Sequence, residues 1–139
     1  MADPFNLQRF VDAQADVYDR VRAELRAGAK RGHWIWFIFP QHSALGHSQT
    51  AKHFGIGSLD EARAYLAHPV LGPRLRECAR LVSAVRGRTI NAMFGSPADL
   101  KVRSSMTLFA EATDDDADFT AVLDKYYGGE PDPRTLDLL

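Results

Sequence analysis

The fold of this chain is decided by one apolar stretch, His33-Trp34-Ile35-Trp36-Phe37-Ile38-Phe39-Pro40-Gln41, which holds both tryptophans of the sequence. Such a stretch belongs in a protein core. Its β-branched and aromatic residues favour a strand. However, no second stretch of similar character is available to pair with it, and an unpaired buried strand leaves backbone groups without partners. A helix packed on all sides is the other interpretation, and it is the one we favour. Pro40 ends the element in either case.

Size and composition describe an ordinary folded domain. The chain has 139 residues, of which 45% are apolar and 25% charged, and this length suits one domain over residues 1–139. The net charge of −1 argues against general nucleic-acid binding, which depends on neutralising phosphates with basic residues. The single cysteine, Cys78, excludes an intramolecular disulfide, and its place among apolar residues favours a buried, inert thiol. No signal peptide and no membrane-spanning run is recognised, so we expect a cytoplasmic protein without a membrane partner.

Hydrophobic residues recur at spacings of three and four over most of the remaining chain, which is typical of amphipathic helices. The segments expected to be helical are 7–27, 58–67, about 70 or 73 to 85, 97–112 and one that ends at Gly128-Gly129, with a short apolar tail over 135–139. Asn6 and a Ser58–Glu61 capping box are predicted helix starts, and Gly28 is a predicted stop. The sequence therefore predicts a mainly α fold, a single compact domain of five to seven helices with little or no strand.

The aromatic stretch also suggests a binding site. Trp34 and Trp36 each carry an indole N–H that needs a hydrogen-bond partner when buried, and His33 and Gln41 flank them. Small-molecule sites are mostly apolar with a few placed polar groups. Two interpretations stay open here: an aromatic-walled pocket on which a ring stacks, or an aromatic core cluster with satisfied edges.

Polar residues on two expected helices are further candidates. Lys101 precedes Ser104 and Ser105 by three and four residues, so the three side chains share one face of a helix. Gln14 and Tyr18 lie one turn apart in the same way. The alternative for both groups is an ordinary polar helix face.

A metal or cofactor site is not indicated. His42, His47 and His53 lie in a glycine- and serine-rich segment, and long loops in compact domains are often functional. Their spacing does not place two ligands on one helix face, as zinc motifs require. No Walker loop and no G-x-G-x-x-G motif occurs. We therefore predict no metal and no cofactor.

Several motifs together resemble one bacterial family. They are residues 33–41, the turn 45–48, the block 61–69 continuing through 71–75, and residues 101–109. The family is the uncharacterised domain of unknown function eighteen-ten, whose members are sometimes labelled calpastatin. The resemblance covers nearly the whole chain and implies a small, mainly helical domain without an assigned activity. The calpastatin label does not fit, because inhibitor repeats of that kind are disordered and this composition is that of a folded globule.

Two segments are also similar to the YbiA-like (NADAR) domains, which act on N-glycosidic bonds of ribosylated compounds. Residues 10–14 resemble their Phe-Gln-Ala-Gln helix, and residues 127–139 resemble their glycine-rich turn and final leucine helix. Those domains carry a glutamate where this chain has Gln8. Because Gln8 cannot act as a carboxylate base, either another group serves catalysis here or the domain binds without cleaving.

The first function hypothesis is binding or hydrolysis of a ribosylated or nucleotide-like metabolite, with N-glycosidase-like chemistry. In this hypothesis Trp34 or Trp36 stacks on a ring and Lys101 contacts phosphate. The residues expected to hold hydroxyl groups are Gln14, Gln41, Ser104 and Ser105. His33 is the candidate for proton transfer, since an ordinary histidine titrates near pH ~6.5, and Asp12 or Asp99 is the candidate carboxylate.

The second hypothesis is a non-catalytic structural or protein-interaction module. In it the aromatic stretch is pure core, and Lys101, Ser104 and Ser105 form hydrogen bonds between helices. The sequence does not decide between the two, and it makes no prediction of the oligomeric state.

Overall fold

The computed structural model describes residues 3–139 and is built from helices. Its α-helices are α1 Gln8–Gln14, α2 Tyr18–Ala27, α3 Ile35–Ile38, α4 Gln49–His53, α5 Leu59–Ala67, α6 Leu71–Ala84, α7 Ile90–Phe94, α8 Ala98–Glu111, α9 Ala117–Tyr126 and α10 Pro133–Leu138, with a 3₁₀ turn η1 at Ser43–Leu45. Within this part of the chain the only β pairing is an isolated bridge between His42 and Ile56. The predicted mainly α fold is confirmed. Among residues 3–139, no helix combines the length and apolarity needed to span a bilayer.

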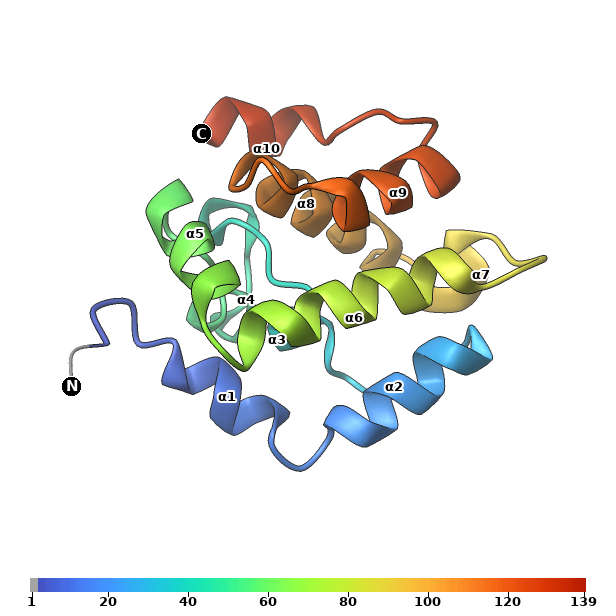
Figure 1. Ribbon diagram of the computed structural model, residues 1–139, viewed down its shortest axis with the longest axis horizontal. Coiled ribbons are helices and arrows are strands. Elements are labelled where there is room, and N and C mark those ends of the chain that lie inside the picture. The colour runs from blue at the N-terminus through green and yellow to red at the C-terminus, as the bar shows by residue number, and fades with distance from the viewer. Residues whose placement is uncertain (1–2) are drawn as a thin grey trace.

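The long helix α6 is the centre of the arrangement. Figure 1 shows α6 crossing the middle of the molecule, with α1 and α2 on one side and α8, α9 and α10 on the other. α2 and α9 both pack on α6, while α8 packs on α9 and α10. α5 bridges these groups because it contacts both α6 and α8. Cys78 on α6 is only 1% exposed, as expected, and burial raises the pKa of its thiol to about 12.

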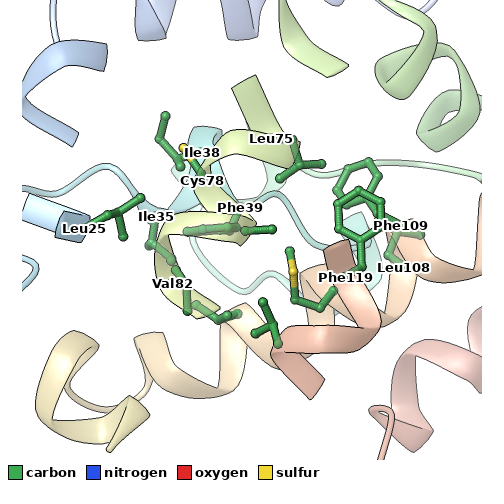
Figure 2. Close-up of a cluster of buried hydrophobic side chains, with 14 of the residues drawn as sticks. Leu25, Ile35, Ile38, Phe39, Leu75, Cys78, Val82, Leu108, Phe109 and Phe119 are labelled. Atoms are coloured by element: carbon green, nitrogen blue, oxygen red, sulfur yellow. The ribbon is translucent and has the colours of Figure 1, made fainter. Parts of the chain in front are cut away.

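The aromatic stretch forms a short buried helix, which confirms the favoured interpretation. α3 spans only Ile35–Ile38, and Trp34, Ile35, Ile38 and Phe39 are each at most 3% exposed. The helix ends at Phe39 because a residue that precedes a proline is disfavoured in the α conformation. In Figure 2 the side chains of Ile35, Ile38 and Phe39 lie among those of α6, α8 and α9 at the centre of the core.

The expected helix over residues 7–27 is wrong as one element, because it divides into α1 and α2 at residues 15–17. α1 packs on α3, whereas α2 packs on α6, and one straight helix cannot follow both surfaces. Asn6 is not the N-cap that we expected and has a positive φ of 51°. The carboxylate of Asp3 accepts hydrogen bonds from the amides of Leu7 (2.8 Å) and Gln8 (3.0 Å) instead.

Other predicted boundaries agree more closely. Ser58 caps α5, since its hydroxyl accepts a 3.1 Å bond from the amide of Glu61. The Glu61 carboxylate reaches the amide of Gly57 (3.0 Å) rather than that of Ser58. Gly28 ends α2 in the left-handed conformation, with φ 68°. Over the described residues the helices number ten rather than five to seven, because the first expected helix divides and the five-residue helices α4 and α7 form in addition to the expected ones.

Candidate functional site

A cavity of about 520 Å³ opens between the first half of α8, the segment from Gln41 to Ala51, and the start of α10. Its volume falls within the range of ordinary small-molecule sites. The apolar part of its wall consists of Leu45, Ala51, Pro97 and Leu100. The polar side chains come from Gln41, His47, Ser48, Lys101, Arg103, Ser104, Asp132 and Arg134. The wall therefore holds three permanent cations and one carboxylate.

Lys101 lines this wall and lies against Trp36 of the aromatic stretch. Its ammonium lies 5.0 Å from the centroid of the Trp36 ring, a cation–π arrangement. Among the residues of the described range, no carboxylate forms an ion pair with Lys101. Trp36 itself is only partly buried. The positive charge at this end of the cavity is therefore not neutralised by the protein.

A second lysine lies near the first. The Lys30 ammonium is 5.4 Å from the Trp34 ring, so the two tryptophans of the aromatic stretch each hold one lysine. Burial lowers the pKa of Lys30, and the charge of Lys101 lowers it further, while Glu24 acts in the opposite direction. Lys30 and Lys101 thus lie against the two tryptophans of the aromatic stretch, one lysine on each ring.

The carboxylate of the cavity belongs to Asp132, at the start of α10. The hydroxyls of Ser104 (2.8 Å) and Thr135 (2.6 Å) both donate to its Oδ2. Burial opposes ionisation of Asp132, but the hydroxyls of Thr135 and Ser104 and the backbone amides of Arg134 and Thr135 together outweigh it, so the pKa of this carboxyl is lowered. Asp132 is thus a fixed negative charge, and neither hydroxyl uses its Oδ1.

The segment that carries Asp132 is fastened to α8. Arg103 donates to the backbone carbonyls of Glu130 and Pro131, each at 3.0 Å. The Thr107 hydroxyl accepts a 2.8 Å bond from the amide of Asp132. Successive turns of α8 therefore carry Lys101 and Ser104, which line the cavity, and Thr107, which holds the backbone of Asp132.

The structure brings together four of the residues predicted for a site. Gln41, Lys101 and Ser104 line the cavity, and Trp36 lies against the Lys101 ammonium. No Phe, Tyr or Trp is part of the described lining, so the expected tryptophan wall is replaced by aliphatic side chains and a lysine that lies over Trp36. The three-residue spacing of Lys101 and Ser104 on one predicted helix indicated that these two side chains share a face.

Three other predicted ligand-binding residues are in the protein interior. Trp34 is 2% exposed, and its indole N–H donates to Glu24 (3.0 Å), so it offers no face for stacking. Gln14 is 1% exposed and donates to the carbonyl of Phe37 (2.8 Å), which ties α1 to α3. Ser105 is fully buried beside Ser104, and its hydroxyl has no partner among the described residues.

The two residues predicted for catalysis lie outside the cavity wall. His33 is exposed at the start of the aromatic stretch. Asp12 is exposed on α1, where it accepts a 2.9 Å hydrogen bond from Gln8. Asp99, the alternative carboxylate, is partly buried in the first turn of α8 and is not part of the lining either.

Sequence reasoning missed Asp132 and Arg134, the two charges that α10 brings to the cavity. A signal was present, because an aspartate directly before a proline is typical of a helix start. That signal gives the position of Asp132 in the chain but not its contacts with Ser104 and Thr107, which lie on α8.

A second cavity of about 400 Å³ lies on the other side of the 129–131 segment. Its acidic residues are Glu111, Asp114 and Asp116, which alternate with the threonines Thr107, Thr113 and Thr120. Within residues 3–139, no group of three histidine, cysteine or acidic side chains is arranged to hold a metal ion. The two cavities thus have opposite charge.

Comparison with known proteins identifies the family. The family model described as "Protein of unknown function (DUF1810)" matches residues 4–139. The chain is also similar to the crystal structure of the conserved hypothetical protein Rv1873 from Mycobacterium tuberculosis, with 62% identity and a TM-score of 0.97 over 99% of this chain and 98% of that chain. No curated protein matches. The chain therefore belongs to the DUF1810 family of proteins of unknown function, the family that its motifs resemble.

Proposed function

We propose that this protein binds a small phosphate-bearing, nucleotide-like metabolite in the cavity between α8, the 41–51 segment and α10. The observation that carries the proposal is Lys101, which lines the cavity without a carboxylate partner among the described residues. A partly buried ammonium on an indole face is a strong site for an anion, because the ring already orients the charge.

The other charges of the wall support the same ligand. Arg134 lines the cavity from α10 and Arg103 from α8. Arg103 is partly committed elsewhere, because it also contacts the carbonyls of Glu130 and Pro131 and lies 3.8 Å from the Glu130 carboxylate. The volume of about 520 Å³ suits a nucleotide-sized molecule. Leu45, Pro97 and Leu100 provide the apolar surface that a base or sugar ring would contact.

Hydrolysis of an N-glycosidic bond is the finer form of this proposal. Such a reaction needs a carboxylate near the sugar, to stabilise the positive charge that develops there and to take a proton from the attacking water. Asp132 is the carboxylate in the described wall, whereas Asp12 and His33 lie outside it. The resemblance to the YbiA-like domains suggests this chemistry, but the position of their glutamate is taken by Gln8, which lies outside the cavity wall. In this proposal Asp132 supplies the carboxylate from a different part of the chain.

Binding can be tested by calorimetric titration of the full chain with AMP, ADP-ribose, NAD and adenosine. We expect the phosphate-bearing compounds to bind and adenosine to bind at least tenfold more weakly, because it lacks the anion that Lys101 attracts. Lys101→Ala should abolish this difference. Lys52→Ala, which removes an exposed lysine of α4, is the matched control. The absence of heat and of a thermal shift with every phosphate compound would contradict the proposal, and analysis of the mixtures for released base tests hydrolysis separately.

The second candidate, a protein-interaction module, is favoured by one observation. Leu136, Leu138 and Leu139 on and after α10 are 38%, 40% and 43% exposed, more than is usual for leucine. If this surface is the functional one, Leu138→Asp should leave the phosphate titrations unchanged and disrupt a complex seen by sedimentation.

A further inference from the structure

The cavity is not uniformly basic, and this limits what it binds. A fully ionised phosphate is best bound by cations and by hydrogen-bond donors such as amides and hydroxyls. Here a carboxylate, Asp132, faces the same space as Lys101 and Arg134. An anion is repelled from that part of the wall, so a ligand that fills the cavity must present hydrogen-bond donors to Asp132 and negative charge to the cations.

The geometry of Asp132 shows which part of the carboxylate is available. Ser104 and Thr135 both donate to Oδ2, and these two residues are themselves buried at 8% and 0% exposure. The Asp132 amide is bonded to Thr107, so the backbone is fixed as well. The backbone amides of Arg134 and Thr135 also favour the charged form of this carboxylate. Because the side chain is already ordered by these groups, a ligand that donates to Oδ1 does not bear the cost of ordering it.

We infer that Asp132 recognises sugar hydroxyls, and that the cavity therefore selects a phosphate ester whose sugar keeps its vicinal hydroxyl groups. This inference rests on the proposed function. A vicinal diol offers two O–H donors within reach of one carboxylate, whereas a deoxy sugar offers one fewer and inorganic phosphate repels the carboxylate. Ser104 and Thr135 position the carboxylate, and Lys101 binds the phosphate.

The experiment compares three probes, AMP, 2′-deoxy-AMP and inorganic phosphate, by calorimetric titration at fixed ionic strength. Wild-type protein should bind AMP about tenfold more tightly than 2′-deoxy-AMP, the effect expected of one hydrogen bond to a charged group. Asp132→Asn should reduce this ratio to less than about twofold and bind inorganic phosphate several-fold more tightly, because the repelling charge is gone. Asp137→Asn, an exposed carboxylate of the same helix, is the control and should behave as the wild type.

A second variant guards against a folding defect. Ser104→Ala leaves the carboxylate in place and removes one of its two hydroxyl donors. It should weaken the preference for AMP while phosphate affinity stays within about twofold of wild type. If AMP and 2′-deoxy-AMP bind the wild type equally, or if Asp132→Asn keeps the preference, the inference is overturned while phosphate binding stands. If no probe binds the wild type, the proposed function itself fails.

Discussion

The ammonium of Lys101 on α8 lies 5.0 Å from the ring centroid of Trp36 on α3. This contact joins the aromatic stretch to the cavity, because Lys101 lines the cavity while Trp36 belongs to the helix that enters the core. Lys101 lies over the face of the Trp36 ring, while the indole N–H is buried and has no hydrogen-bond partner in the described part of the chain.

Lys101→Ala should cost little stability. A partly exposed cation–π contact contributes about 0.5–1 kcal/mol, so the free energy of unfolding in urea should fall by no more than that. The loss of ligand binding should be much larger. A fall of more than about 2 kcal/mol would show that Lys101 serves the fold, as the interaction-module hypothesis requires.

Arg9 should be essential to the fold. Its guanidinium lies 2.8 Å from the Glu61 carboxylate, donates to the carbonyls of His53 (2.8 Å) and Gly55 (3.0 Å), and both charged side chains are about nine-tenths buried. Arg9→Met leaves Glu61 without its buried partner and should cost about 3–5 kcal/mol in urea unfolding.

Two controls make the Arg9 measurement specific. Adding Glu61→Gln to Arg9→Met should recover part of the lost stability, because no unpaired charge then remains. Arg63→Ala breaks an exposed pair with Asp60 and should change stability by less than about 1 kcal/mol. Equal losses for Arg9→Met and Arg63→Ala would contradict the role of the buried pair.

Gly72→Ala should be strongly destabilising. A Cβ at Gly72 would lie 2.1 Å from the carbonyl oxygen of Leu66, because α5 turns into α6 at this point, and the obstacle is backbone rather than a flexible side chain. We expect a loss of roughly 2 kcal/mol or more in thermal or urea unfolding. Gly57→Ala is the control, since its Cβ would meet only the Glu61 carboxylate at an ordinary 3.5 Å. A wild-type Tm for Gly72→Ala would mean that the α5–α6 turn relaxes freely.

Glu24 should make stability depend on acid pH. Burial opposes its ionisation, but hydrogen bonds from the amides of Gly32 and Arg31 and from the Trp34 indole prevail, so the pKa of Glu24 is lowered from 4.5. A carboxyl with a lowered pKa stabilises the folded state above its unfolded pKa, and this contribution is lost as pH falls through the folded value. Glu24→Gln should therefore be less stable than wild type at pH 7, and the difference should shrink at pH 4 and below.

The Glu24 measurement compares urea unfolding at pH 7 and at pH 3. Asp137→Asn, an exposed carboxylate, should run parallel to wild type at both values. If the free energy of unfolding differs between wild type and Glu24→Gln by the same amount at both pH values, then the packing of Glu24, rather than its charge, determines its contribution to stability.

The sequence predicted correctly those helices that carry their own apolar stripe and their own start and stop residues. The boundaries expected for α5, α6 and α8 agree with the structure to within about three residues, because capping residues and glycines act on their own neighbours. The break between α1 and α2 carries no glycine or proline. It is set by packing on α3 and α6, which no local pattern contains.

The candidate site shows the same division. Lys101 and Ser104 were predictable because three residues along a helix always share a face. Asp132 and Arg134 were not, because they reach the cavity only when α10 folds back on α8. Trp34 and Gln14 were predicted to bind a ligand but are buried in the core. The sequence does not show whether a polar or aromatic side chain faces a ligand or the core.

The stripe Lys101–Ser104–Thr107 has a consequence for how the gene can vary in length. Each residue added to α8 between Lys101 and Thr107 would rotate the following side chains by about 100° around the helix axis. The Lys101 ammonium would then no longer lie on the same face as the Thr107 hydroxyl, which binds the amide of Asp132. Insertions and deletions should therefore be absent from this helix in related genes and tolerated in the exposed acidic loop at 114–115, where a change of length disturbs neither partner of the cavity.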